Sequence, residues 1–268
     1  MNFFFDIDGT ILPFGRSAPD SAVAAIRKLR RDGHRAFLAT GRSPVEVLDS
    51  VYEIGFDGGV FSAGADIIVN GKQIYRAVMT SAERDYILSY CRSKGFRVLV
   101  QSEKGTYVSE EALEFWRSKM RKYAGQEVSL SSLIVSDDIP EETEVIKLLY
   151  VTDNYALEDV RKDLQGRFSV VDNTVGLPSR MMGEIVMNGI TKATGIDRIL
   201  EYLGEDISET AAFGDGANDI EMVEHAAFGI AMGNASEDLK EVASWIAPPV
   251  DQDGLDIGIK HVLSIVKT

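Results

Sequence analysis

Hydrophobic residues near the N-terminus occur in short continuous runs. Asn2–Phe5 predicts a buried strand that stops at Asp6. Ser21–Arg31 carries apolar residues at helical spacing and is closed by Gly33, and Ala36–Ala39 predicts the next strand. A strand, a helix and a strand in this order indicate a βαβ unit. Strands that are apolar throughout are typical of a parallel sheet with helices on both faces.

The C-terminal third repeats this alternation. The expected strands are Ile185–Met187, Thr210–Phe213 and Gly229–Met232, and the expected helices are Lys192–Leu203, Ile220–His225 and Glu237–Val242. Nearer the N-terminus, Pro44–Glu53 predicts a helix, and Asn70-Gly71 predicts a hairpin between strands at Ile67–Val69 and Gln73–Tyr75. Both ends are therefore predicted to form one α/β core, a Rossmann-like, doubly wound parallel sheet.

The middle of the chain follows a different pattern. Its expected helices are Glu83–Lys94, Glu110–Tyr123 and Leu157–Leu164, with a hairpin over Arg97–Val108 and strands at Val145–Val151 and Phe168–Val171. The two α/β ends must complete one sheet to bury their apolar faces, so this α+β segment is expected to be inserted between them. The prediction is a core from residues 1–80 and 184–268 and an inserted α+β cap domain over residues 81–183.

Composition narrows the classes of function. The net charge of −14 repels polyanions, so neither nucleic acid nor an anionic membrane is expected as a partner. Cys91 is the one cysteine and there are three His, which excludes an intramolecular disulfide and a Cys/His zinc cluster. The sequence contains neither a signal-peptide pattern nor an apolar run of ~20 residues. We expect a cytoplasmic protein, with a monomer as the default.

Two acidic clusters directly follow predicted strands. Asp6 and Asp8 follow the first strand, and residues two apart point to the same side of an extended chain. Asp215 and Asp219 lie in a Gly-rich turn after a later strand. Ligands of a parallel sheet bind beyond the carboxyl ends of its strands, and carboxylate oxygens suit Mg²⁺. The predicted metal ligands are therefore Asp6, Asp8, Asp215 and Asp219.

Two more strand ends add groups that suit a phosphoryl group. Thr40-Gly41-Arg42 offers a hydroxyl, an open backbone and a cation, and Lys192 offers an amine. Each motif by itself is typical of an ordinary turn. Four such groups, each at a strand end of one predicted sheet, are much harder to explain as turns.

Together these residues resemble the haloacid dehalogenase (HAD) superfamily, specifically its Cof-type phosphatases with a C2-type (IIB) cap. The four motifs of that superfamily match in order at Asp6–Thr10, Thr40–Arg42, Lys192 and Gly214–Asp219, and the similarity continues at Ala231–Ala235 and Asp251–Leu255. Two positions depart from the pattern. Ser62–Ala65 stands where Asn-Gly-Ala is usual, and Ala193 where Gly is common. Neither touches the catalytic carboxylates, so they affect substrate contacts rather than the reaction type.

The resemblance implies a role for each matching residue. Asp6 is implied to be the nucleophile, and Asp8 the general acid that afterwards activates water. Mg²⁺ is implied to bind Asp6, the backbone carbonyl of Asp8 and Asp215, with Asp219 in support. The predicted phosphate-binding residues are Gly9, Thr40, Gly41, Arg42, Lys192 and Asn218.

The expected function is that of a magnesium-dependent phosphatase. It would hydrolyse small phosphorylated metabolites, sugar phosphates foremost, through an aspartyl-phosphate intermediate. Three alternatives stay open: a phosphomutase of the same superfamily, a phosphorylation-switched receiver, and a phosphate-binding module without activity. A receiver is disfavoured because its acidic pair and phospho-acceptor lie on different strands, whereas here both acids follow one strand.

Overall fold

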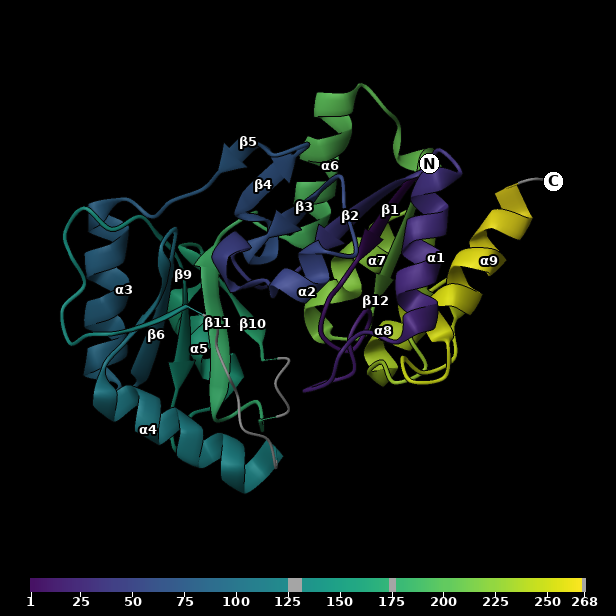
Figure 1. The fold of residues 1–268 in the computed structure, drawn as a ribbon. Helices are drawn as coiled ribbons and strands as arrows, with labels where there is room; N and C mark the ends of the chain where they lie inside the picture. Colours follow the sequence, from purple (N-terminus) through teal and green to yellow (C-terminus); the bar gives the residue numbers. More distant parts are fainter. Residues whose placement is uncertain (125–131, 174–176, 267–268) are drawn as a thin grey trace. The chain divides into compact units, whose positions relative to one another are not determined.

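The computed structural model describes residues 1–124, 132–173 and 177–266, which form two compact units (Figure 1). The first unit comprises Met1–Arg42, Val47–Arg76 and Thr191–Thr268, and the second comprises Ser43–Glu46 and Ala77–Ile190. Of the segment expected to form the inserted domain, residues 125–131 and 174–176 lie outside the described residues. Among the helices that the structure describes, none is long and apolar enough to cross a membrane.

The first unit contains an eight-stranded sheet in the order β14-β13-β12-β1-β2-β3-β4-β5. Its strands are β1 (Asn2–Phe5), β2 (Arg35–Ala39), β3 (Gly58–Phe61), β4 (Asp66–Val69), β5 (Lys72–Arg76), β12 (Thr210–Gly214), β13 (Phe228–Ala231) and β14 (Trp245–Ile246). The strands from β14 to β3 pair in parallel, and β4 and β5 continue the sheet in antiparallel pairing. The expected α/β class with a parallel sheet is confirmed.

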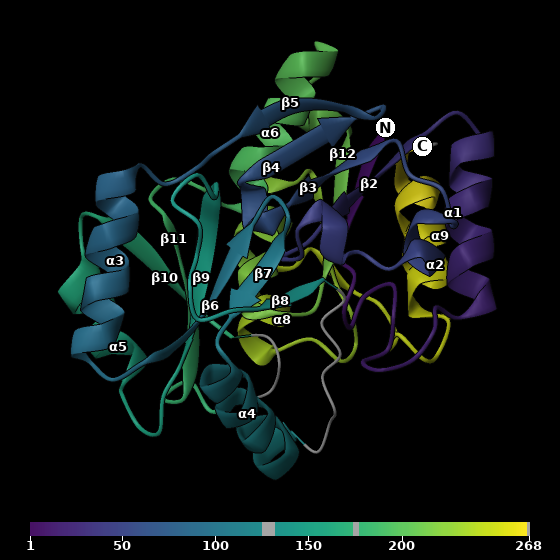
Figure 2. The same cartoon turned by 60° about the vertical axis from the view of Figure 1, so that its left-hand side comes forward.

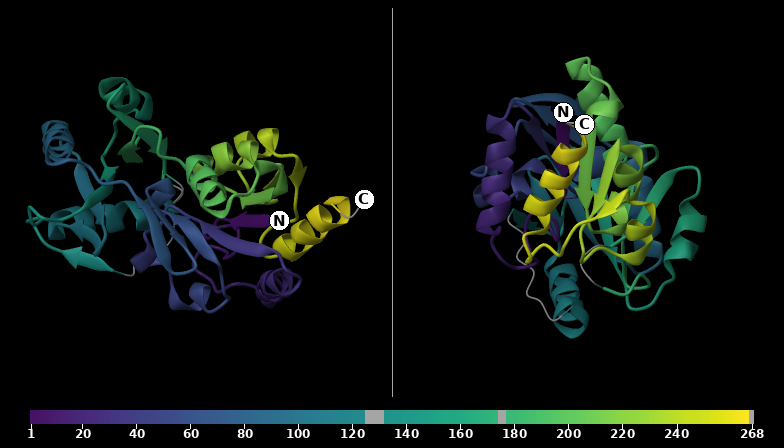
Figure 3. Two further views of the ribbon diagram at one scale, coloured as in Figure 1. Left: turned by 90° about the horizontal axis from the view of Figure 1, so that it is seen from above. Right: turned by 90° about the vertical axis from the view of Figure 1, so that its right-hand side faces the viewer.

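Helices cover both faces of this sheet (Figure 3). They are α1 (Asp20–Arg31), α2 (Asp49–Tyr52), α6 (Lys192–Leu203), α7 (Ile220–His225), α8 (Glu237–Val242) and α9 (Gly254–Val266). Phe3 and Phe5 of β1 share a core with α1 and α9, whereas Phe4 shares the opposite core with α6 and α7. Successive side chains of a strand point to opposite faces of the sheet, and both faces are covered here, so all three rings are buried. This explains why the apolar run is uninterrupted.

The second unit contains a six-stranded sheet in the order β10-β11-β9-β6-β7-β8 (Figure 2). Its strands are β6 (Arg97–Ser102), β7 (Gly105–Val108), β8 (Leu133–Val135), β9 (Val145–Val151), β10 (Phe168–Asp172) and β11 (Met182–Met187). Helices α3 (Ser81–Ser93) and α5 (Leu157–Leu164) share a core with one face, and α4 (Glu110–Lys119) packs Trp116 into a core with Leu99 and Val151 on the other.

Two expectations about elements are wrong. The strand expected at Ile185–Met187 in the core is part of β11, which pairs antiparallel with β9 and β10, so residues 184–190 belong to the second unit. An apolar run predicts a strand but not the sheet that it joins. The helix expected over Pro44–Glu53 is interrupted, because Leu48 is extended and separates the 3₁₀ turn Pro44–Glu46 from α2.

Candidate active site

The turn after β1 places the first predicted motif at the carboxyl end of the sheet. The N–H of Asp6 donates to the carbonyl of Phe213 at 3.0 Å, which continues the pairing of β1 with β12. Gly9 then has φ +91°, and its N–H closes the turn on the carbonyl of Leu12 at 2.7 Å. A Cβ at Gly9 would lie 2.0 Å from Oδ2 of Asp215, so only glycine lets the two acidic turns approach this closely.

Lys192 joins two of the predicted acids. Its Nζ donates to Oδ1 of Asp6 at 2.7 Å and to Oδ1 of Asp219 at 2.5 Å, and all three residues are buried. Lys192 is the first residue of α6, where Thr191 and Thr194 exchange capping hydrogen bonds. The helix dipole disfavours a cation there, so the two carboxylates are needed to stabilise the buried ammonium.

The second acidic turn is held by Asp219. Its Oδ2 accepts hydrogen bonds from the backbone N–H groups of Asp215 and Gly216, at 3.0 and 2.9 Å. The carboxylate of Asp215 receives longer bonds, from the Thr10 hydroxyl at 3.3 Å and from the Asn234 amide at 3.4 Å.

Three carboxylates converge at this point. Asp6, Asp215 and Asp219 each present an oxygen, and these oxygens lie within 4.8 Å of one another. Burial raises the pKa of Asp6 to about 7, although Lys192 opposes the rise. Burial, with the charges of Asp6 and Asp219, raises the pKa of Asp215 to about 8. The charge of Lys192 lowers the pKa of Asp215 by less than these effects raise it, and a divalent cation is the species that such oxygens bind.

Arg42 is bound to Asp8. Its Nε and Nη2 donate to Oδ2 and Oδ1 of Asp8, both at 2.7 Å, in a two-pronged ion pair. The buried Thr40 hydroxyl accepts from the backbone N–H of Arg42 at 3.2 Å, with Gly41 between them. Asn218, the remaining predicted phosphate ligand, lies half-buried in the 3₁₀ turn Ala217–Asp219.

Sequence reasoning matched Ala231–Ala235 to the superfamily but gave Asn234 no role at the site. Asn234 follows β13, and its Nδ2 donates to the carbonyl of Gly9 at 2.8 Å, while its Oδ1 accepts from the N–H of Val250 at 2.9 Å. It therefore ties the turn after β1 to the loops after β13 and β14. Gly233-Asn234 directly after an apolar strand is the signal that could have identified it.

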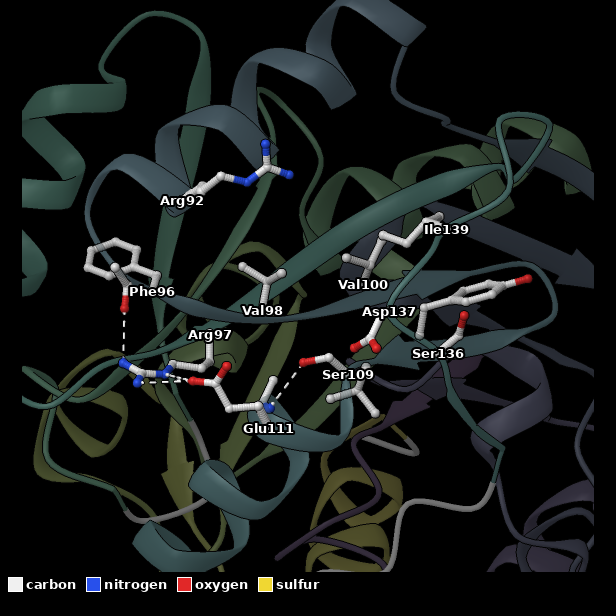
Figure 4. Close-up of a pocket in the computed structure, with 14 residues that line it drawn as sticks. Arg92, Phe96, Arg97, Val98, Val100, Ser109, Glu111, Ser136, Asp137 and Ile139 are labelled. Atoms are coloured by element: carbon white, nitrogen blue, oxygen red, sulfur yellow. Dashed lines mark hydrogen bonds and ion pairs between the residues drawn. The ribbon is translucent and has the colours of Figure 1, made fainter.

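A cavity of about 430 Å³ lies in the second unit (Figure 4). It is lined by residues from the end of α3, from β6 and β7, from the start of α4 and from 136–139. Arg97 on its wall is paired with Glu111 at 3.2 Å. None of the predicted site residues is among the described residues that line it, so the acid cluster of the first unit is the candidate active site.

Comparison with known proteins identifies the family. Residues 3–259 match the family of haloacid dehalogenase-like hydrolases. The chain belongs to this family. YkrA of Bacillus subtilis (strain 168) is 30% identical over 266 residues, covering 97% of this chain and 96% of YkrA, and its name describes it as a phosphatase. Phosphatase YwpJ of the same organism is 25% identical over 279 residues, covering 96% and 98%.

A solved structure extends the family likeness to the fold. The sugar phosphatase BT4131, of HAD subclass IIB, is 28% identical with a TM-score of 0.79, and the match covers 97% of this chain and 98% of BT4131. The resemblance to IIB-type HAD phosphatases seen in the sequence is thereby confirmed. This HAD-family hydrolase is an enzyme of the phosphatase class.

Proposed function

We propose that this enzyme is a magnesium-dependent phosphomonoesterase of small phosphorylated metabolites, sugar phosphates foremost, that works through an aspartyl phosphate on Asp6. The observation that carries the proposal is the position of Asp6, a buried carboxylate held by Lys192 beside Asp215. The likeness to a sugar phosphatase supports the substrate class. The second unit would serve as the cap that excludes water and selects the leaving group.

The residues present fit a magnesium ion. Asp6, Asp215 and the backbone carbonyl of Asp8 would hold it, because two carboxylates leave room for the waters and substrate oxygen that Mg²⁺ keeps. Oδ1 of Asp219 accepts from Lys192, and its Oδ2 accepts from the backbone N–H groups of Asp215 and Gly216. Because both of its oxygens already have donors, we assign Asp219 a supporting role. When bound, the ion would supply positive charge that offsets the carboxylates and the phosphate.

The reaction has two balanced steps. Lys192 binds Oδ1 of Asp6, so we assign Oδ2 to the attack on phosphorus. As this bond forms, the bond from phosphorus to the leaving oxygen breaks, and Asp8 donates its proton to the leaving oxygen. Asp8 then takes a proton from water, which attacks phosphorus, frees Asp6 and yields inorganic phosphate.

The donors of the site hold the transferring group during both steps. Thr40, Lys192, Asn218 and the backbone at Gly41 would bind the phosphoryl oxygens as their charge develops. The N–H of Gly9, also predicted to bind phosphate, already donates to the carbonyl of Leu12. Arg42 would add its positive charge and orient Asp8 through their ion pair.

The first test is release of inorganic phosphate from a panel of sugar phosphates, nucleotides and cofactor phosphates. We expect turnover of a few members with Mg²⁺, loss of turnover with a chelator and recovery when Mg²⁺ is restored. Movement of phosphate between sugar positions would instead indicate a mutase. No turnover of any member would contradict the proposal.

Substitution of the nucleophile is the second test. Asp6→Asn is expected to lower kcat by ~10³-fold or more, because an amide cannot form the covalent intermediate. Circular dichroism and thermal unfolding check the fold, and Asp159→Asn, an exposed acid on α5, is the control with unchanged kinetics. Substantial activity in a folded Asp6→Asn enzyme would rule out the aspartyl phosphate.

A further inference from the structure

The turn after β3, Ser62–Gly64, lies in one of the two segments where the sequence departs from the superfamily pattern. Ser62 and Ala63 have φ +50° and +57°, and Gly64 follows with φ +110°. All three residues are buried. A left-handed backbone is unfavourable for a residue with a Cβ, and here two such residues stand in succession. Strain of this kind persists only where the surrounding structure maintains it, so the contacts of this turn are informative.

One side of the turn binds the backbone of two proposed phosphate-site residues. The N–H of Ser62 donates to the carbonyl of Arg42 at 2.8 Å, and the N–H of Ala63 donates to the carbonyl of Thr40 at 2.9 Å. The hydroxyl of Ser62 is fully buried and has no hydrogen-bond partner among the described residues. A buried hydroxyl without a partner is unfavourable, so the backbone N–H groups, rather than this side chain, explain the conformation.

The other side of the turn lies against the start of α6. A Cβ at Gly64 would be 2.1 Å from the carbonyl oxygen and 2.6 Å from the carbonyl carbon of Thr191. Both atoms belong to the backbone and cannot swing aside, so only glycine allows this approach. Thr191 is the N-cap of α6, and the next residue is Lys192. The ammonium of Lys192 in turn binds Asp6 and Asp219.

A second glycine brings the first turn of α6 close to β3, beside which this helix packs (Figure 1). A Cβ at Gly195 would lie 2.4 Å from Cγ1 of Val60, the residue two before Ser62. Helix α6 is therefore held near β3 by two close approaches, one to backbone atoms and one to a side chain. All of these residues belong to the first unit.

We propose that Gly64 and Gly195 are positioning residues for the reaction. By letting α6 approach β3 and the turn Ser62–Gly64, they determine where Lys192 lies relative to the backbone that the turn binds at Thr40. The spacing between the Thr40 hydroxyl and the Lys192 ammonium must match the oxygens of a single phosphoryl group. The inference rests on the proposed function, in which these two groups bind the phosphoryl oxygens.

Gly64→Ala tests this role. The added methyl group must push α6 away from the turn, so kcat/KM for the best sugar phosphate of the panel is expected to fall by ~10–100-fold. Inhibition by orthovanadate, which mimics the five-coordinate phosphoryl group, should weaken by a similar factor. Lower stability alone would leave the vanadate affinity of the folded enzyme unchanged, so both measurements are made well below the Tm.

Gly33→Ala is the matched control. Gly33 has φ +92°, and a Cβ there would have nothing within 4 Å, so this variant adds backbone strain without a close approach. We expect its kcat/KM and its inhibition by orthovanadate to equal those of the unmodified enzyme. Unchanged vanadate inhibition in a folded Gly64→Ala enzyme would overturn the proposal.

Gly195→Ala permits a rescue experiment that also serves if Gly64→Ala fails to fold. Its Cβ would meet the side chain of Val60 rather than backbone, so Val60→Ala in the same chain makes room for it. Gly195→Ala alone is expected to lower kcat/KM by ~10-fold, and the double variant to return to within ~3-fold of the unmodified enzyme. Losses that multiply in the double variant would contradict a role in positioning.

Amide hydrogen exchange provides a readout that needs no turnover. Gly64→Ala is expected to speed exchange in the peptides that contain Ser62–Gly64 and the first two turns of α6, with exchange in α9 unchanged. Gly33→Ala should leave the first two peptides unchanged. Unchanged exchange in both peptides of Gly64→Ala would refute the close approach. If the unmodified enzyme hydrolyses nothing, the proposed function fails, and the exchange result still decides whether Gly64 holds α6 in place.

Discussion

Two glycines with left-handed backbones show how single residues define the site. Gly9 and Gly15 have φ +91° and +70°, a conformation that costs a residue with a Cβ ~1–2 kcal/mol. Their surroundings differ. A Cβ at Gly9 would meet the carboxylate of Asp215, whereas one at Gly15 would have nothing within 4 Å.

Replacing each glycine by alanine separates backbone strain from close approach. Gly15→Ala is expected to cost only the backbone term of ~1–2 kcal/mol, with kinetics unchanged. Gly9→Ala is expected to cost more and to lower kcat/KM by ~100-fold or more, because Asp215 must move away from Asp6. Urea unfolding and phosphate release measure the two effects. Equal behaviour of the two variants would contradict the close approach.

At the scale of elements, the N-terminus of α6 holds Lys192, a proposed phosphate-binding residue, where the helix dipole disfavours a cation. The capping exchange between Thr191 and Thr194 fixes the first turn that carries Lys192. Helix α3 has the same arrangement, with Thr80 and Glu83, in the second unit. The two helices therefore have matching caps, but only the first turn of α6 carries Lys192.

Removal of each cap distinguishes helix stability from site geometry. Thr191→Ala and Thr80→Ala are each expected to lower the free energy of unfolding by ~1 kcal/mol. We expect only Thr191→Ala to reduce kcat, by several-fold, because Lys192 then loses its fixed position between Asp6 and Asp219. Chemical denaturation and steady-state kinetics give both quantities. A loss of activity in Thr80→Ala as large as in Thr191→Ala would show that the caps act only through general stability.

At the scale of the whole molecule, a chain with a net charge of −14 gathers three acids at one point and buries two of them, Asp6 and Asp219, against Lys192. The pKa of Asp6 is about 7 and that of Asp215 about 8, both raised from 3.8. Between pH 3.8 and these raised pKa values, Asp6 and Asp215 keep protons in the folded protein that they have released in the unfolded chain. The metal-free protein should therefore lose stability as pH rises through this window.

Metal and pH are consequently linked. In chelator, the Tm is expected to fall between about pH 5.5 and 8.5, and Mg²⁺ should raise the Tm by more at the upper end, where its ligands have lost their protons. Glu205, whose pKa is lowered from 4.5, titrates below this range. Thermal scans with Mg²⁺ and with chelator measure the effect, and Asp215→Asn should flatten it. A Tm in chelator that rises with pH would show that the acids are not destabilised by burial.

Much of the core and of the site was predictable from local pattern. Strand ends located Asp6, Asp215 and Asp219, and the structure brings these three acids within 4.8 Å of one another. Lys192 reaches Asp6 and Asp219 from the first turn of α6, whereas the strand predicted before it joins the other sheet. Periodicity and turn chemistry suffice here, because parallel strands gather their carboxyl ends at one edge of a sheet.

Pairings between distant residues were decided only in three dimensions. The sequence by itself determined most of the strands and helices, though not the break at Leu48, and which acids follow the strands. Tertiary structure decided that β11 joins the second sheet, that Arg42 pairs with Asp8, and that Asn234 binds Gly9. It also decided that Gln101 binds Glu46. Local spacing carries the period and turn type of a segment, whereas the choice of partner depends on packing and hydrogen bonding among residues far apart in the chain.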